Sequence, residues 1–171
     1  MVDKSELLDF LEILDKKLEK PIELIAVGGT AMTLLGTKTS TIDIDFEVKP
    51  EEYPTLKKGL SILPHGYRVD IFTGGLIFSQ QLPDNYREKS VPIKHFKNIR
   101  LLALHPIDIV VTKIGRLNER DKEDIKSCIE KFDLTKEQIR ERAQKVEYAG
   151  KEELYKDSLE HVIKLFFGSV K

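Results

Sequence analysis

With 171 residues, 40% of them hydrophobic and 33% charged, the chain has the size and composition of one globular domain. Its 28 basic residues nearly balance its 29 acidic ones, and the net charge of −1 excludes a global basic field, so DNA sequence recognition is not expected. One cysteine, no signal-peptide pattern and no apolar run of roughly 18 residues favour a cytoplasmic location without an internal disulfide or a membrane partner.

The first 36 residues predict a helix, a strand and a second helix. Leucines recur at helical spacing between Ser5, which can cap the first helix, and Pro21, which ends it. Residues 22–27 are mostly apolar and predict a short buried strand. The Gly28-Gly29 pair then turns the chain into a second helix, which ends at Gly36.

Between residues 41 and 104 the pattern is mainly extended. Strands are predicted over residues 41–48, 67–72, 90–96 and 99–104. A short helix over residues 50–60 separates the first two strands, and the aperiodic residues 74–84 predict a loop or hairpin.

From Pro106 onward the pattern becomes helical. Pro106 suits the first turn of a helix whose apolar stripe continues to Leu117. Further helices are predicted over residues 122–131, 135–146 and 151–167. We therefore predict an α/β (α+β) fold, with a small mixed sheet flanked by helices in residues 1–105 and a helical extension in residues 106–171 that packs on this core as part of a single domain.

Two acids alternate with large apolar residues in the first of these strands. Asp43 and Asp45 should share its polar face, while Ile42, Ile44 and Phe46 point into the core. Neighbouring ionised carboxylates repel each other, and Mg²⁺ or Mn²⁺ between them would relieve the repulsion and reach substrate phosphates. Two such ions can clamp the attacking and leaving oxygens of a nucleotidyl displacement. A strand whose solvent face happens to carry acids is the alternative interpretation.

The glycine turn that precedes these acids suits a phosphate ligand. Gly28 and Gly29 let the backbone approach a ligand closely, Thr30 adds a hydroxyl, and the following helix begins with unpaired N–H groups. A tight turn without a ligand is the alternative. The dinucleotide fingerprint G-x-G-x-x-G and the phosphate loop G-x-x-x-x-G-K-[ST] are both absent. A third acid is expected on a neighbouring strand, and Asp70 is the best candidate, unless it only forms a surface pair with Arg68.

The glycine turn, the alternating acids and the later acid resemble, in this order, the nucleotidyltransferase superfamily, whose signature is G-[GS], then h-D-h-D-h, then an acid on a third strand. The motifs lie in residues 22–72 and resemble in particular the small prokaryotic branch of minimal and abortive-infection toxin-like nucleotidyltransferases. The resemblance implies that Asp43, Asp45 and Asp70 bind metal, that Asp70 alternatively activates the acceptor, and that the glycine turn with Thr30 seats a nucleoside triphosphate.

The toxin-like branch also carries a lysine on a helix after the sheet and an Arg-Asp-x-x-Asp segment downstream. By this resemblance Lys113 would contact nucleotide phosphates, and Asp121 or Asp124 would orient basic groups or support the site. Independently, Lys113, Arg116 and Arg120 should share one helix face, and such a cationic strip suits a triphosphate or an RNA end. A solvated charged face with an Arg120–Asp124 pair is the alternative.

The resemblance implies Mg²⁺-dependent transfer of a nucleoside monophosphate to an acceptor hydroxyl. By analogy with the toxin-like branch the acceptor is a tRNA or a protein, and a cognate antitoxin is a candidate partner. The alternative is a non-catalytic nucleotide-binding or toxin–antitoxin module that keeps the fold, and the orientation of Asp70 relative to Asp43 and Asp45 discriminates between them. Abundant Lys and Glu with few Asn and Gln favour a thermophilic source.

Overall fold

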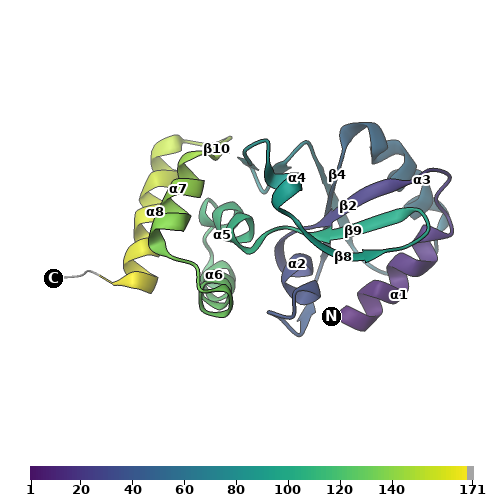
Figure 1. The fold of residues 1–171 in the computed structure, drawn as a ribbon, viewed down its shortest axis with the longest axis horizontal. Coiled ribbons are helices and arrows are strands. Elements are labelled where there is room, and N and C mark those ends of the chain that lie inside the picture. Colours follow the sequence, from purple (N-terminus) through teal and green to yellow (C-terminus); the bar gives the residue numbers. More distant parts are fainter. Residues whose placement is uncertain (169–171) are drawn as a thin grey trace. The chain divides into compact units, whose positions relative to one another are not determined.

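A mixed β-sheet with flanking helices and a group of C-terminal helices form two compact units, which a computed structural model describes over residues 1–168 (Figure 1). The first unit comprises Met1–Gly74 and Arg87–Leu104. The second comprises Gly75–Tyr86 and the chain from His105 onward. The predicted α/β (α+β) fold class is confirmed. That the helical part packs on the core as one domain stays a prediction.

The first unit is built on a five-stranded sheet of order β5-β4-β2-β9-β8. Its strands are β2 (Ile22–Ala26), β4 (Ile44–Val48), β5 (Val69–Thr73), β8 (Val91–His95) and β9 (Ile99–Ala103). β2 runs parallel to β9 and antiparallel to β4, β5 runs parallel to β4, and β8 runs antiparallel to β9. Every strand predicted between residues 22 and 104 is therefore represented, with shifted ends.

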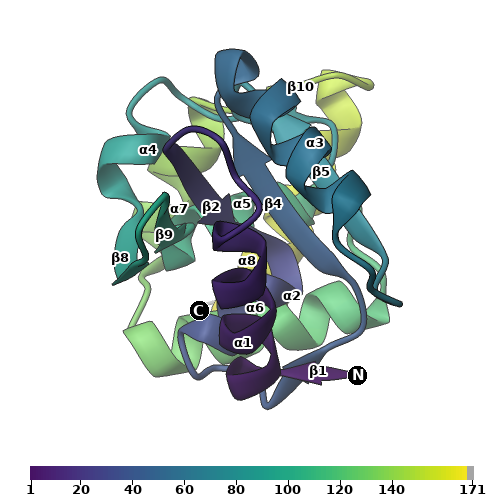
Figure 2. The ribbon, with the colours of Figure 1, turned by 90° about the vertical axis from the view of Figure 1, so that its right-hand side faces the viewer.

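Three helices accompany this sheet. They are α1 (Lys4–Asp15), α2 (Gly28–Leu34) and α3 (Tyr53–Ile62), the last preceded by a 3₁₀ turn, Pro50–Glu52. Figure 2 shows α1 and α3 in front of the sheet, and they touch where Gly59 of α3 lies next to Leu14 and Leu18. The helix cap predicted at Ser5 is wrong, because Asp3 caps α1 and forms a reciprocal capping box with Glu6.

The strand predicted over residues 41–48 is interrupted. Its first part is β3 (Ser40–Thr41), which pairs with β1 (Val2–Asp3), and β4 begins only at Ile44. Between them lies a bend at Ile42 and Asp43. The expectation that Ile42 points into the core is wrong, since it is 52% exposed, whereas Ile44 and Phe46 are fully buried as predicted.

The second unit consists mainly of helices. They are α5 (Pro106–Ile114), α6 (Glu119–Phe132), α7 (Lys136–Gln144) and α8 (Glu152–Phe167). α5 packs against the other three, and Figure 1 shows α7 beside α8. A small sheet joins β10 (Glu147–Tyr148), β7 (Gln80–Gln81) and β6 (Leu76–Ile77), so the predicted hairpin is confirmed. A short helix, α4 (Tyr86–Lys89), follows. Within residues 1–168, no helix combines the length and apolar character needed to cross a bilayer.

A buried ion pair ties the second unit together. The guanidinium of Arg142 donates to both carboxylate oxygens of Asp108, at 2.6 and 2.9 Å, and also to Asn85 Oδ1 at 2.7 Å. Asp108 is fully buried and Arg142 is nearly so. The pair therefore holds α5, α7 and the segment before α4 together, and each charge depends on the other for compensation.

We expect Asp108→Ala to lower the free energy of unfolding by about 3–5 kcal/mol, because it leaves the Arg142 charge buried without its carboxylate. Urea unfolding measures the change. Glu160→Ala is the control, because it removes the exposed Arg140–Glu160 pair, and it should cost less than about 1 kcal/mol. Equal effects of the two substitutions would contradict this prediction.

Candidate functional site

Two of the predicted acids are direct neighbours across two strands. Asp45 in β4 pairs with Asp70 in β5 in parallel register. Neighbouring strands lie roughly 4.8 Å apart, and paired residues project from the same face of the sheet. Ile44 and Phe46 are buried on the opposite face. The carboxylates of Asp45 and Asp70 therefore share one face, which meets the condition for a metal-binding or acid–base pair.

Asp43 lies outside this strand pair. It occupies the bend before β4 and is half-buried. In the part of the chain that the structure describes, no group of three or more His, Cys, Asp or Glu side chains is arranged to hold a metal ion. The structure thus brings Asp45 and Asp70 together but does not close a three-carboxylate cluster with Asp43. Two carboxylates from adjacent strands still fit one hard divalent cation, such as Mg²⁺, that completes its shell with water and phosphate oxygens.

Asp70 also makes the surface pair that the alternative interpretation expected. Its Oδ2 lies 3.4 Å from Nε of Arg68, whose side chain is 73% exposed, while that of Asp70 is 42% exposed. Exposed pairs of this kind contribute about 0–1 kcal/mol. The Arg68 contact is therefore weak enough for a cation or an acceptor hydroxyl to replace it at Asp70.

The hydroxyl of Thr30 joins the glycine turn to the acidic segment. It donates to the carbonyl oxygen of Asp43 at 3.2 Å and accepts from the backbone N–H of Asp45 at 2.9 Å. Thr41 donates to the same Asp43 carbonyl at 2.8 Å. Because Thr30 is fully buried, its hydroxyl acts on the backbone of the acids, and we infer that it positions Asp43 and Asp45.

The two glycines form the first turn of α2. Gly28 has a φ of +53°, a conformation that favours glycine, and the helix is only seven residues long. A Cβ added to Gly29 would lie 2.9 Å from Thr41 Oγ1 and 3.8 Å from Nζ of Lys38. Gly28 is thus needed for the backbone conformation of the turn, and Gly29 is needed for its close packing against Thr41. The ammonium group of Lys38, which sequence reasoning missed, also lies next to this turn.

A buried charge network occupies the same sheet face as Asp45. Glu47 follows Asp45 by two residues in β4 and is fully buried. Arg87 donates to Glu47 and, at 2.9 Å, to Glu23, which also accepts from Arg100 at 3.0 Å. Sequence reasoning missed Glu47, although strand alternation could have placed it on the face of Asp45, and no local pattern identifies Arg87 as its partner. Arg87 keeps the buried charge of Glu47 from adding to the repulsion between Asp45 and Asp70.

Two basic residues of the second unit, Lys113 and Arg116, form a cluster with two acids, so that the formal charges balance. Lys113 is 2% exposed, and its Nζ lies 3.3 Å from Asp121 Oδ1 and 3.0 Å from Asp124 Oδ2. Arg116 binds Asp121 with two hydrogen bonds of 2.9 and 2.8 Å. Two positive charges thus face two negative ones, and Asp121 orients both basic groups.

The expected cationic strip on one helix face is not formed. α5 ends at Ile114, and Arg120 belongs to the next helix, α6, where it is exposed. The predicted continuation of the apolar stripe to Leu117 fails for the same reason. Asp124, the acid of the alternative Arg120–Asp124 pair, has its Oδ2 3.0 Å from Nζ of Lys113.

Burial raises the pKa of Asp121, but the hydrogen bonds from Arg116 and the charge of Lys113 outweigh it, so the pKa lies below its usual value. Asn118 strengthens this effect through its backbone N–H, which donates to Asp121 Oδ2 at 3.2 Å. Asp121 therefore stays ionised at neutral pH.

Comparison with family models matches residues 5–164 to a family described as nucleotidyltransferase of unknown function (DUF6036). The match includes both compact units and nearly all of the sequence, so the chain belongs to this nucleotidyltransferase family. The resemblance predicted from the glycine turn and the acids is confirmed at this level. No curated protein and no solved structure matches the chain.

We expect Thr30→Val to lower the free energy of unfolding by about 1–3 kcal/mol, because the Asp45 N–H loses its buried acceptor. Thr30→Ser keeps the hydroxyl and should cost less than the valine variant. Urea unfolding of the two variants is the measurement. A valine variant as stable as the wild type would show that the hydroxyl does not hold this segment.

The stability contributed by Asp121 should depend on pH. The pKa of Asp121 is lower in the folded chain than in the unfolded chain, so its contribution to the free energy of unfolding is complete above the unfolded-state pKa of about 3.9. This contribution is lost as the pH falls through the folded-state pKa. Asp121→Asn should therefore be less stable than the wild type at pH 7, and the difference should shrink below about pH 4. Urea unfolding at several pH values measures it, with the exposed Asp84→Asn variant as control. A difference that does not change with pH would contradict the prediction.

Proposed function

We propose that the protein transfers a nucleoside monophosphate from a nucleoside triphosphate to an acceptor hydroxyl. The observation that carries this proposal is the in-register pairing of Asp45 and Asp70, joined through Thr30 to the glycine turn. Family membership supports nucleotidyl transfer as the reaction class. The acceptor, tRNA or protein, follows only from the resemblance to the toxin-like branch.

In the proposed reaction the acceptor oxygen bonds to the α-phosphorus, the bond from that phosphorus to the β-phosphate oxygen breaks, and pyrophosphate leaves. Asp45 and Asp70 would hold Mg²⁺ or Mn²⁺, which would supply charge neutralisation at the phosphates. Asp70, which contacts the exposed Arg68, can instead accept the proton of the hydroxyl. Asp43 would add a carboxylate from the bend.

The remaining residues of the proposal position these groups. Gly28 and Gly29 would let the triphosphate approach the backbone, and Thr30 fixes the acids next to them. In the second unit, Arg116 and Arg120 are exposed enough to contact a nucleotide, whereas the buried Lys113 would act through Asp121 and Asp124. The proposal therefore assigns phosphate contact to the two arginines and support to the lysine and its acids.

A non-catalytic nucleotide-binding module is the second candidate. It is favoured by the failure of Asp43 to join Asp45 and Asp70 in a three-ligand group among the described residues. Asp70 nevertheless shares a face with Asp45, which favours the enzyme. A protein that binds nucleoside triphosphates, seen as a rise in melting temperature, but never labels an acceptor would establish the binding module. A cognate antitoxin as partner remains part of the proposal for either candidate.

We expect the purified protein, with Mg²⁺ and α-labelled nucleoside triphosphates, to label bulk tRNA or protein. Asp45→Asn and Asp70→Asn should each lower the rate roughly 100-fold or more, because each removes a charged ligand worth several kcal/mol in the transition state. Asp84→Asn, an exposed acid outside the site, is the matched control and should retain the rate.

Labelling is measured with all four nucleotides and with both acceptor pools. No labelling by the folded wild type under any of these conditions would overturn the enzymatic proposal. Labelling that survives Asp45→Asn would retain an enzyme but refute the assignment of this carboxylate.

A further inference from the structure

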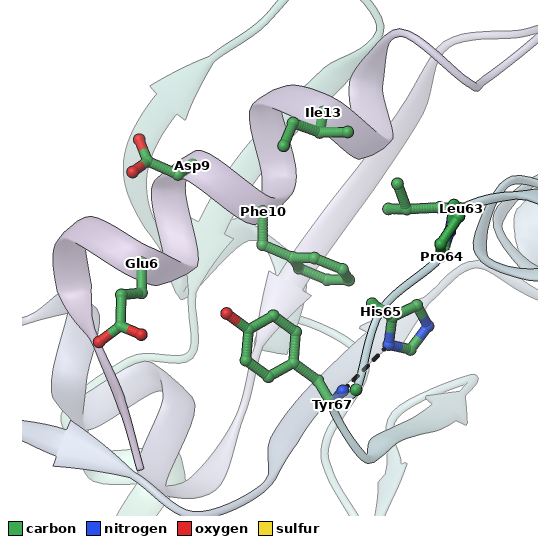
Figure 3. Close-up of a pocket in the computed structure, with 9 residues that line it drawn as sticks. Glu6, Asp9, Phe10, Ile13, Leu63, Pro64, His65 and Tyr67 are labelled. Carbon is green, nitrogen blue, oxygen red and sulfur yellow. Dashed lines mark hydrogen bonds between the residues drawn. The ribbon is translucent and has the colours of Figure 1, made fainter.

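A pocket on the first unit, outside the candidate site, has two chemically different ends (Figure 3). Its volume is about 360 Å³, and it lies between α1 and the segment that leads from α3 into β5. α1 contributes the carboxylates of Glu6 and Asp9 at one end, both exposed. Ile13, Leu63 and Pro64 form the other, apolar end.

Aromatic rings lie between these two ends. The Phe10 ring meets the rings of His65 and Tyr67 edge-on, with centroids 5.4 and 5.2 Å apart. His65 and Tyr67 are nearly parallel, with an interplanar angle of 21°. The backbone N–H of Tyr67 donates to Nδ1 of His65 at 3.2 Å. The aromatic rings therefore lie next to two carboxylates, and neither Lys nor Arg is among the residues that line the pocket.

We propose that this pocket docks an arginine side chain from a basic segment of a partner protein. Arginine has an apolar stem and a planar cationic head, and the two ends of the pocket match these parts in order. A guanidinium can stack on an aromatic face and donate to carboxylates at the same time, which a compact ammonium group does less well.

The charge of the pocket decides between classes of partner. All the charged groups that line it, Glu6 and Asp9, are acidic. Nucleic-acid phosphates would be repelled by both, so a stacked RNA base is disfavoured although the rings could accept one. A basic protein segment satisfies both the charges and the rings.

The position of the pocket connects docking to the candidate site. His65 and Tyr67 directly precede β5, and Asp70 follows Tyr67 by three residues. A side chain held against these rings would order the start of the strand that carries Asp70. Docking is nevertheless independent of nucleotidyl transfer, and it can be measured on a protein that lacks activity.

The test is titration of the ¹⁵N-labelled full chain with the peptide acetyl-Gly-Gly-Arg-Gly-Gly-amide, followed by NMR. We expect saturable shifts, at roughly millimolar peptide, in the amides of Leu63, of residues 65–67 and of the exposed face of α1 near Asp9. The same peptide with citrulline, which keeps the shape of arginine and removes its charge, should not bind. Asp9→Asn should weaken binding roughly threefold or more.

Glu12→Gln is the matched control, because Glu12 is an exposed acid of the same helix that does not line the pocket, and it should leave the affinity unchanged. Equal binding of the citrulline peptide, equal effects of Asp9→Asn and Glu12→Gln, or shifts confined to other residues would each overturn the proposal. A short single-stranded RNA that shifts the same amides at lower concentration than the arginine peptide would replace the protein partner with a nucleic acid.

Discussion

The hydroxyl of Thr30 makes the two motifs of the candidate site into one structure. The hydroxyl lies in the first turn of α2, yet both of its hydrogen bonds go to the backbone on either side of Ile44. The Val27 N–H adds a third connection, to the Asp45 carbonyl at 3.1 Å. Since Thr30 and Val27 are fully buried, the start of β4 cannot move without moving the glycine turn. A ligand that binds at either motif would therefore affect the geometry of the other.

The sheet face that carries Asp45 and Asp70 concentrates negative charge, and two arginines compensate this charge in different ways. Arg87 compensates Glu47, which is fully buried, and Glu23 through contacts that are largely shielded from solvent. Arg68 contacts Asp70 where both side chains are more accessible. The charge of Glu47 and Glu23 is thus held by a shielded cation, whereas that of Asp70 faces a replaceable one. This arrangement suits a site that must exchange one cation for another, since the deeper charges stay fixed while the outer ones change partners.

Local patterns in the sequence predicted the acids, the glycine turn and nearly all elements, because these depend on alternation and helical spacing within short windows. Predictions failed where the local structure or the partner of a side chain depends on residues far away in the sequence. The break at Ile42 and Asp43 depends on hydroxyls of Thr30 and Thr41, which only tertiary structure brings together. Arg87 lies 64 residues from Glu23, and periodicity carries no information over that distance.

Other errors could have been avoided, because a local sequence pattern marked the correct start of the helix. Asn118 and Asp121 form a capping box, so the beginning of α6 could have been found from the spacing of a capping residue and an acid three positions later. Because α6 begins at Glu119, Lys113 and Arg120 belong to different helices, and the predicted cationic strip on one helix face is not formed. Likewise, Asp3 precedes Glu6 by three residues, and this spacing competes with Ser5 as the helix start. The position of Asp70 on a strand beside that of Asp45 was predicted, whereas the register that pairs the two residues directly was not.

The two compact units are interleaved along the chain, and this has a consequence for biosynthesis. Residues of the first unit are complete once Leu104 has been made, but the segment Gly75–Tyr86 belongs to the second unit. Its Asn85 must wait for Arg142, 57 residues later. During synthesis this segment, with the apolar Ile77 and Leu82, emerges before the rest of the second unit. The nascent chain therefore passes through a stage in which the residues of the sheet are complete while the β6–β7 hairpin still lacks its partner strand β10.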